Sequence, residues 1–160
     1  MRLALLALAS VAVSALAVTP VQAQVRSADI VSWTASVETS GRGQAEVVLR
    51  AQIREGWRLY AMGSPVGRPL TVAFDPLPEG LTATGPIRQS TPREDFDKGL
   101  GLDYTYFAQS ATLRQPLRVD TRARGRQTLS GTVRFSVCDD SVCLPPAAVE
   151  FGASLNVGRR

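Results

Sequence analysis

Apolar and polar side chains alternate along three segments of the chain, and this period of two constrains the fold more than any other feature. The segments are residues 45–53, 129–137 and 147–155. Successive side chains of a β-strand point to opposite faces, so each segment is typical of a strand with one face in a core and one in water. No long helical period accompanies them. The sequence therefore predicts a mostly β domain.

Weaker strand patterns and frequent turn signals extend this prediction along the chain. The weaker strand candidates are residues 29–37, 57–61, 70–74, 104–107 and 112–119. Glycine- and proline-rich turns, such as residues 40–43 and 76–80, separate the candidates. Seven or more short strands with frequent turns favour an all-β fold, an immunoglobulin-like antiparallel two-sheet sandwich.

The strand patterns also predict core positions and one long loop. The expected core residues are Val133, Phe135, Val137, Val149, Phe151 and Leu155. Residues 86–101 carry many charges and no strand pattern, so they are predicted to form a surface loop. Loops of that length in a compact domain tend to be functional or disordered.

The start of the chain has the parts of a secretory signal peptide. A short positive segment precedes an apolar run over residues 3–18, and Val21-Gln22-Ala23 places small residues where a signal peptidase cuts. The run falls short of the roughly 20 residues that span a bilayer. We therefore expect residues 1–23 to be cleaved. Residues 24–160 are then a single periplasmic domain without stable membrane insertion.

Charge and composition exclude several classes of function. The chain carries 18 Lys and Arg residues against 14 Asp and Glu residues, for a net charge of +4. Its arginines are scattered among acids, which favours a solvated surface over a nucleic-acid partner. The sequence contains no histidine. Ser-His-Asp and Cys-His catalysis are excluded, and the usual ligand of catalytic zinc is missing, so we expect no metal site and no cofactor.

The two cysteines, Cys138 and Cys143, stand between two of the strong strand patterns. This places them at the ends of a hairpin-like connection, where facing Cα atoms can meet the separation that a disulfide needs. An exported protein with a single pair of cysteines is expected to form the disulfide. Asp139 and Asp140 bring negative charge close to any thiolate, so they are expected to raise the cysteine pKa values.

Spacing alone leaves the role of this bond open. A bridge that closes about six residues stabilises the fold by about 2 kcal/mol through chain entropy, against about 4.7 kcal/mol for a loop of about 100 residues. Redox exchange and a structural staple are therefore both compatible with the spacing. Binding of Cu(I) by the two thiolates is a third interpretation, disfavoured because no further cysteine or methionine lies close in sequence.

Three motifs resemble the N-terminal periplasmic domain of DsbD, the thiol:disulfide interchange protein. The most specific is the cysteine segment over residues 137–146, which ends in Pro145-Pro146. Gly56-Trp57-Arg58-Leu59-Tyr60 precedes it in the chain, as do residues 94–101 with the aromatic segment that follows them. The motifs fall in the family's order, and the resemblance covers nearly all of residues 24–160.

The resemblance implies an immunoglobulin-like domain that acts as a thiol–disulfide oxidoreductase of the protein-disulfide reductase type. Such a domain accepts electrons from a membrane-embedded thiol transporter and reduces thioredoxin-fold partners, which isomerise disulfides or mature c-type cytochromes. Cys138 and Cys143 match the redox pair, and Cys143 matches the cysteine that forms the mixed disulfide with a partner.

The resemblance also implies residues around the cysteine pair. Phe96, with Glu94 and Asp95 before it, matches a cap loop that shields the cysteines, and Tyr60 matches an aromatic residue beside them. Arg58 stands where family members can have an aromatic residue, and some members have one more residue between the cysteines.

The family's membrane domain and C-terminal thioredoxin domain do not occur in these 160 residues. The expected electron donor is therefore a separate membrane thiol transporter. A different class of function stays open beside this one: a non-catalytic periplasmic binding or adaptor module with a structural disulfide.

Overall fold

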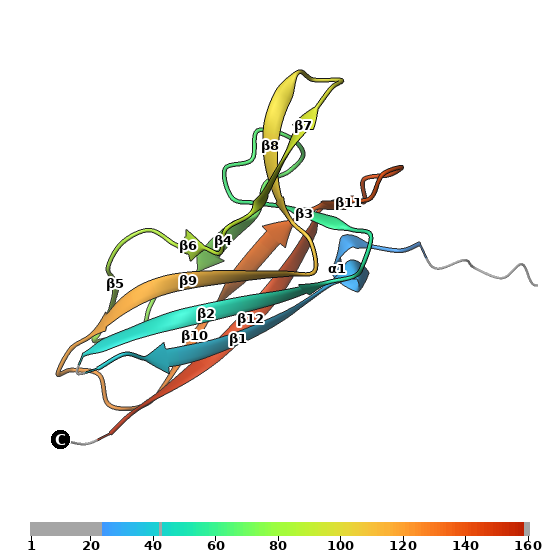
Figure 1. Ribbon diagram of the computed structural model, residues 1–160. Helices are drawn as coiled ribbons and strands as arrows, with labels where there is room; N and C mark the ends of the chain where they lie inside the picture. Colours follow the sequence, from blue (N-terminus) through green and yellow to red (C-terminus); the bar gives the residue numbers. More distant parts are fainter. Residues whose placement is uncertain (1–23, 42, 159–160) are drawn as a thin grey trace, which may run out of the picture.

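The computed structural model describes residues 24–41 and 43–158. The predicted signal peptide, residues 1–23, lies outside the described residues, and its cleavage stays a prediction. Within the described part, no helix has the length and apolar character needed to cross a membrane. The described chain forms antiparallel sheets preceded by one turn of helix, α1 (Ser27–Ile30) (Figure 1).

Two of the sheets form a sandwich. The first sheet has the strand order β1-β2-β9-β5, with β6 also paired to β9, and the second has the order β12-β10-β4. Their bounds are β1 (Val31–Thr39), β2 (Gln44–Ile53), β4 (Thr71–Phe74), β5 (Leu81–Ala83), β6 (Arg88–Gln89), β9 (Ser110–Val119), β10 (Gly125–Phe135) and β12 (Ala147–Val157). The first sheet lies across the second (Figure 1), which confirms the predicted immunoglobulin-like antiparallel sandwich.

The three strong alternations become β2, β10 and β12, and the burial of their side chains follows the same period. In β10, for example, Val133 and Phe135 are fully buried, whereas Arg134 between them is exposed. Val137, Phe151 and Leu155 are buried as predicted. Val149 is only half-buried, because it lies near the start of β12, an edge strand of its sheet.

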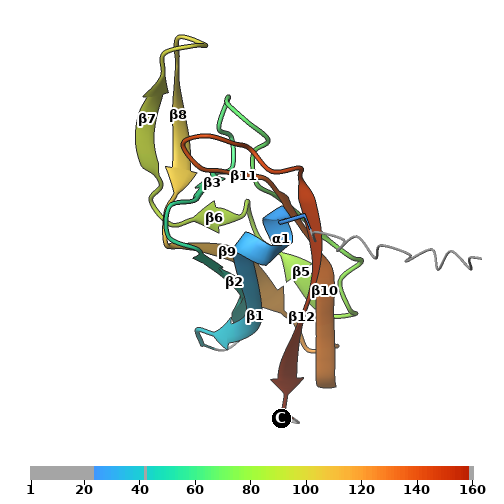
Figure 2. The same ribbon diagram turned by 90° about the vertical axis from the view of Figure 1, so that its right-hand side faces the viewer.

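A third sheet has the strand order β11-β3-β8-β7. It consists of β11 (Val137–Cys138), β3 (Arg58–Tyr60), β8 (Leu102–Phe107) and β7 (Arg93–Asp97). Its inner residues Leu59, Val137 and Phe107 belong to the same hydrophobic cluster as the sandwich core. The β7–β8 hairpin extends beyond the sandwich in both views (Figures 1 and 2).

The prediction of a surface loop over residues 86–101 is wrong. Within this segment β6 pairs with β9, and β7 pairs with β8 through five successive residue pairs. The prediction failed because it relied on the alternation of apolar and polar residues, which this segment lacks. Four of the five β7 side chains are exposed, so backbone pairing with β8 defines the strand without an apolar face.

Candidate redox site

The two cysteines close a tight turn at the end of β11. Cys138 pairs with Cys143 across an antiparallel bridge, with Cα atoms 4.0 Å apart and the sulfurs joined in a disulfide. The backbone N–H of Asp139 donates to the carbonyl oxygen of Val142 at 3.0 Å inside the turn. The turn therefore holds both cysteines at its two ends, as the flanking strand patterns predict.

Asp139 stabilises the turn from within. Its Oδ1 accepts hydrogen bonds from the backbone N–H groups of Ser141 and Val142, each at 2.7 Å. These backbone hydrogen bonds hold the pKa of Asp139 below its usual value, with a smaller contribution from the charge of Arg58. The carboxylate that sequence reasoning placed beside the sulfurs thus also organises the loop.

The two cysteines differ sharply in exposure. Cys138 retains 4% of its accessible surface, whereas Cys143 is exposed. β11 continues from the buried end of β10, so its last residue stays in the interior while the turn carries the chain outward. The bond is therefore more exposed to solvent at Cys143 than at Cys138.

Cys138 lies in a small cluster of its own with Tyr60 and Val66, and Tyr104 packs against this cluster. The rings of Tyr60 and Tyr104 lie 5.8 Å apart between centroids. Burial is the main cause that raises the pKa of each of these two tyrosines above its usual value, so both stay neutral in ordinary buffers. Tyr60 therefore lies beside Cys138 in the structure.

Arg58 lies directly opposite Cys138 in the pairing of β3 with β11. Its guanidinium donates a hydrogen bond to Asp140 Oδ1 at 2.6 Å and lies over the Tyr106 ring, 5.6 Å from the centroid. The hydrogen bond to Asp140 is the main cause that raises the pKa of Arg58. A permanent cation thus stands next to the buried cysteine, held by an exposed acid on one side and an aromatic ring on the other.

The predicted cap residues lie on β7, within the hairpin. Asp95 Oδ2 accepts a hydrogen bond from the Tyr104 hydroxyl at 3.1 Å, which connects β7 to the tyrosine that packs on the Cys138 cluster. The pKa of Asp95 is lowered first by the backbone N–H of Phe96 and then by this hydroxyl. Asp95 is therefore linked to the site through Tyr104.

Glu94 and Phe96 take a different position. Strand alternation places them on the face of the sheet opposite to that of Asp95, Tyr104 and Tyr60. The Phe96 side chain is 51% exposed, and Phe96 does not belong to the Cys138 cluster. In this arrangement the phenyl ring stands on the projecting hairpin.

Cys143 borders a pocket of about 600 Å³ between the cysteine turn and the start of the described chain. Val142, Leu144 and residues 24–28 contribute to its walls. The buried Ser27 hydroxyl donates to the carbonyl oxygen of Pro145 at 2.7 Å and so fixes α1 to the segment after Cys143. The exposed cysteine therefore lies at the edge of a formed hollow.

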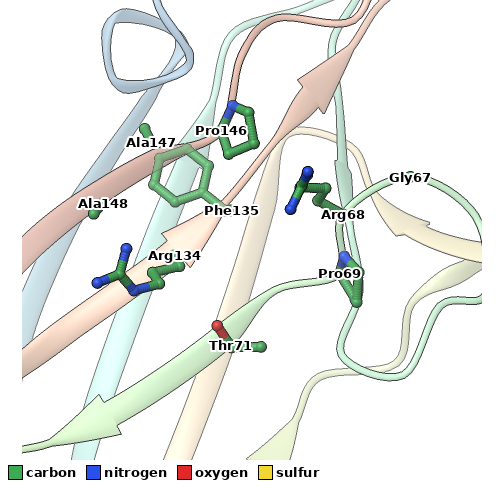
Figure 3. A pocket seen from close by; sticks show the side chains of 9 residues that line it. All are labelled: Gly67, Arg68, Pro69, Thr71, Arg134, Phe135, Pro146, Ala147 and Ala148. Atoms are coloured by element: carbon green, nitrogen blue, oxygen red, sulfur yellow. The ribbon is translucent and has the colours of Figure 1, made fainter.

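A second pocket of about 670 Å³ shares residues 146–148 with the first and is drawn in Figure 3. Arg68 and Pro69 form one wall, and Arg134 and Thr71 lie along its floor on β10 and β4. Pro146 and the two alanines after it line both pockets. The surface next to Cys143 is thus hollowed over a longer stretch than one pocket alone.

The sequence matches one family model over most of its length. Residues 27–154 match the model described as the thiol:disulfide interchange protein DsbD, N-terminal. The chain belongs to the DsbD N-terminal domain family. Membership of this family implies a role in thiol–disulfide interchange, and the disulfide between Cys138 and Cys143 supplies the cysteine pair for it.

One solved structure agrees with this family at the level of the fold. The reduced DsbD N-terminal domain of Neisseria meningitidis has 21% sequence identity and a TM-score of 0.50, covering 78% of this chain and 86% of its own. The N-terminal periplasmic domain of ScsB from Proteus mirabilis has 19% identity and a TM-score of 0.46, covering 75% and 44%. No curated protein matches the sequence.

A third structure contains the N. meningitidis DsbD N-terminal domain in a complex with the PilB N-terminal domain. It has 19% identity to this chain and a TM-score of 0.45, covering 75% of this chain and 80% of its own.

Sequence reasoning assigned no site role to Val66, Tyr104 or Arg58. Alternation along residues 104–106 indicates that Tyr104 and Tyr106 share a face, and this signal could have drawn attention to them. The pairing of β3 with β11 joins residues that are about 80 positions apart in the chain. No local pattern encodes that pairing, so the position of Arg58 next to Cys138 became visible only in the structure.

Proposed function

We propose that this protein is a periplasmic thiol–disulfide exchange protein. It carries electrons from a membrane thiol transporter to thioredoxin-fold partners through Cys138 and Cys143. The observation that carries the proposal is the unequal burial of the two cysteines in a family defined by thiol–disulfide interchange. Exchange runs through a mixed disulfide, so one sulfur must be open to a partner and the other must be protected from it.

Electron transfer to a partner takes two displacements. In the reduced protein the Cys143 thiolate attacks one sulfur of the partner's disulfide, forming a mixed disulfide and releasing the partner's other sulfur as a thiolate. The Cys138 thiolate then attacks Cys143 Sγ, which restores the Cys138–Cys143 bond and releases the partner's first sulfur. The partner gains two electrons and takes up two protons, and this protein loses both.

Re-reduction reverses these steps. A donor thiolate attacks the exposed Cys143 Sγ, and Cys138 leaves as a thiolate. A second donor thiolate resolves the mixed disulfide and leaves both cysteines reduced. The pocket beside Cys143 provides room for the segment of the donor or acceptor that carries the attacking sulfur.

The proposed roles of the surrounding residues follow from their positions. Tyr60 covers Cys138 within the buried cluster, and Asp95 connects the β7–β8 hairpin to this cluster through Tyr104. Phe96 and Glu94 belong to the same hairpin, and we propose that the hairpin limits access to the Cys143 side of the bond.

A trapping experiment with single-cysteine variants tests the proposed function. The partner is a thioredoxin-fold protein that keeps one active-site cysteine, activated with thionitrobenzoate so that each reaction releases a coloured thiol. Cys138→Ala, which leaves Cys143 free, is expected to form the mixed disulfide at least about tenfold faster than Cys143→Ala, because only Cys143 is exposed.

Both variants should react equally fast in denaturant, which controls for differences in the thiols themselves. Equal rates in the folded state, or no reaction of Cys138→Ala with the activated partner, would contradict the proposal. Such a result would favour the adaptor module with a structural disulfide.

A further inference from the structure

When the disulfide opens, a negative charge forms on the sulfur of Cys138, the more buried of the two cysteines. When a donor attacks Cys143, the sulfur that leaves is that of Cys138, and it leaves as a thiolate. Cys138 is 4% exposed and packs among Tyr60, Val66 and Tyr104. Burial in such surroundings disfavours a thiolate, and the sequence contains no histidine to compensate.

Arg58 stands where this charge develops. In an antiparallel pair the side chains of directly opposed residues lie on the same face, with Cβ atoms about 4.5–5.5 Å apart. Arg58 and Cys138 are such a pair. The Arg58 side chain is 30% exposed and is held over the Tyr106 ring, so its charge is only partly screened by water.

Other charged and titratable groups also face this cysteine. They lie on the turn, on β3, on β8 and on β7: Asp139, Asp140, Arg58, Tyr60, Tyr104, Tyr106, Arg93, Asp95 and Asp97. Burial keeps Tyr60 and Tyr104 neutral, so the charges that remain are acids and two arginines, of which Arg58 is the one directly opposite Cys138. The charge of Arg58 also contributes, as a lesser cause, to lowering the pKa values of Asp139 and Asp95.

We propose that Arg58 supplies the positive charge that stabilises the Cys138 thiolate as the disulfide opens, and that Asp140 moderates this charge. The inference rests on the proposed exchange function and deepens it by naming the group that makes the buried cysteine a good leaving group. Asp140 is 84% exposed, so its carboxylate is well solvated and offsets the guanidinium only in part.

The test measures Cys138 alone, without a partner. In a Cys143→Ala background, the rate at which iodoacetamide alkylates Cys138 is followed against pH, and the midpoint pH reports how easily the thiolate forms. Arg58→Gln is expected to raise this midpoint by about half a unit to one unit, because the nearby opposite charge is lost. Arg58→Lys keeps the charge and should keep most of the effect.

Two further variants separate charge from damage to the fold. Asp140→Asn keeps a hydrogen-bond acceptor for Arg58 but removes the negative charge, so it is expected to lower the midpoint. Arg126→Gln removes a charge from the distant end of β10 and should leave the midpoint unchanged. Loss of structure would not shift Arg58→Gln and Asp140→Asn in opposite directions.

The same variants, with both cysteines present, test the effect on the bond. Arg58→Gln should slow the opening of the oxidised disulfide by dithiothreitol about three- to tenfold, since a less stable leaving thiolate departs more slowly. An Arg58→Gln midpoint equal to that of the parent, or an equal shift in Arg126→Gln, would overturn the proposal. If Arg58→Gln fails to fold, an Asp140→Asn variant whose midpoint pH is not lowered would overturn the proposal instead.

These measurements are independent of any partner. A shifted midpoint together with failed trapping would reject the proposed function and keep the role of Arg58. Successful trapping with an unshifted midpoint would keep the proposed function and reject the role of Arg58.

Discussion

Tyr60 connects the cysteine pair to the rest of the third sheet. Its ring packs with Cys138 and Val66 in one cluster and meets Tyr104 at 5.8 Å. Gly67, in the loop between β3 and β4, approaches the same ring: a Cβ added there would lie 2.4 Å from Tyr60 Cε2. A glycine is required at this position both by that close approach and by its backbone φ of +73°.

Gly67→Ala is therefore expected to disturb the site as well as the fold. A left-handed backbone alone costs an alanine about 1 kcal/mol, and the contact with Tyr60 should bring the loss of unfolding free energy to about 2–3 kcal/mol. Gly63→Ala is the matched control, because Gly63 has a φ of +78° and nothing within 4 Å of the added Cβ. Urea unfolding measures both.

In reduced Gly67→Ala, displacement of Tyr60 should also speed the alkylation of Cys138, and Gly63→Ala should not show this effect. Equal losses of stability in the two variants, with no change in alkylation, would mean that Tyr60 does not cover the buried cysteine.

At the scale of elements, the strands that the sequence predicts are those whose side chains enter the core. β2, β10 and β12 carry alternating apolar residues because one face of each packs in the sandwich. β7 has the sequence Arg-Glu-Asp-Phe-Asp, with no apolar face, and is defined by its pairing with β8. Local patterns predict burial, so a strand held by backbone pairing alone leaves no signal.

Some residues of the candidate site could likewise be predicted from local sequence patterns, and others could not. Cys138, Cys143 and the turn between them could be predicted, because two strong strand patterns flank a short connection. Tyr60 and the cap residues were implied by the resemblance alone. The structure brings Tyr60 to Cys138 through β3–β11 pairing, whereas Phe96 points from the hairpin on the opposite face. Alternation within a strand determines the face on which each side chain lies, but it can be applied only after the strand has been located.

The β7–β8 hairpin gives a prediction of its own. If the hairpin limits access to the cysteine turn, it must move so that the face carrying the half-exposed Phe96 ring turns toward Cys143. Phe96→Ala should then raise the rate at which a small neutral thiol reagent labels Cys143 in the reduced protein, by about two- to fivefold.

Leu100→Ala is the control for this prediction, since Leu100 is also an exposed apolar residue of the hairpin and lies in its turn, 63% exposed. Labelling of Phe96→Ala at the parent rate, or an equal increase in both variants, would argue against a covering role for the Phe96 ring.

At the scale of the whole molecule, the sandwich and the third sheet have separate roles. The sandwich buries the large core, including Phe135, Leu113 and Leu129, each of which is about 1% exposed. The third sheet holds the cysteine turn at the margin of this core, through Leu59 and Val137. The disulfide closes only about six residues, so breaking it should cost about 2 kcal/mol of stability and leave the fold intact.

The central claim is that the Cys138–Cys143 bond is a working redox couple. Its most direct test is equilibration of the wild-type protein in glutathione buffers of known potential, followed by rapid alkylation and mass measurement. Circular dichroism of each sample records whether the fold persists. The account predicts a reversible two-electron transition above about −300 mV, with the β-sheet signal unchanged between the oxidised and reduced forms. A bond that stays oxidised throughout, and breaks only when the protein unfolds, would contradict the account.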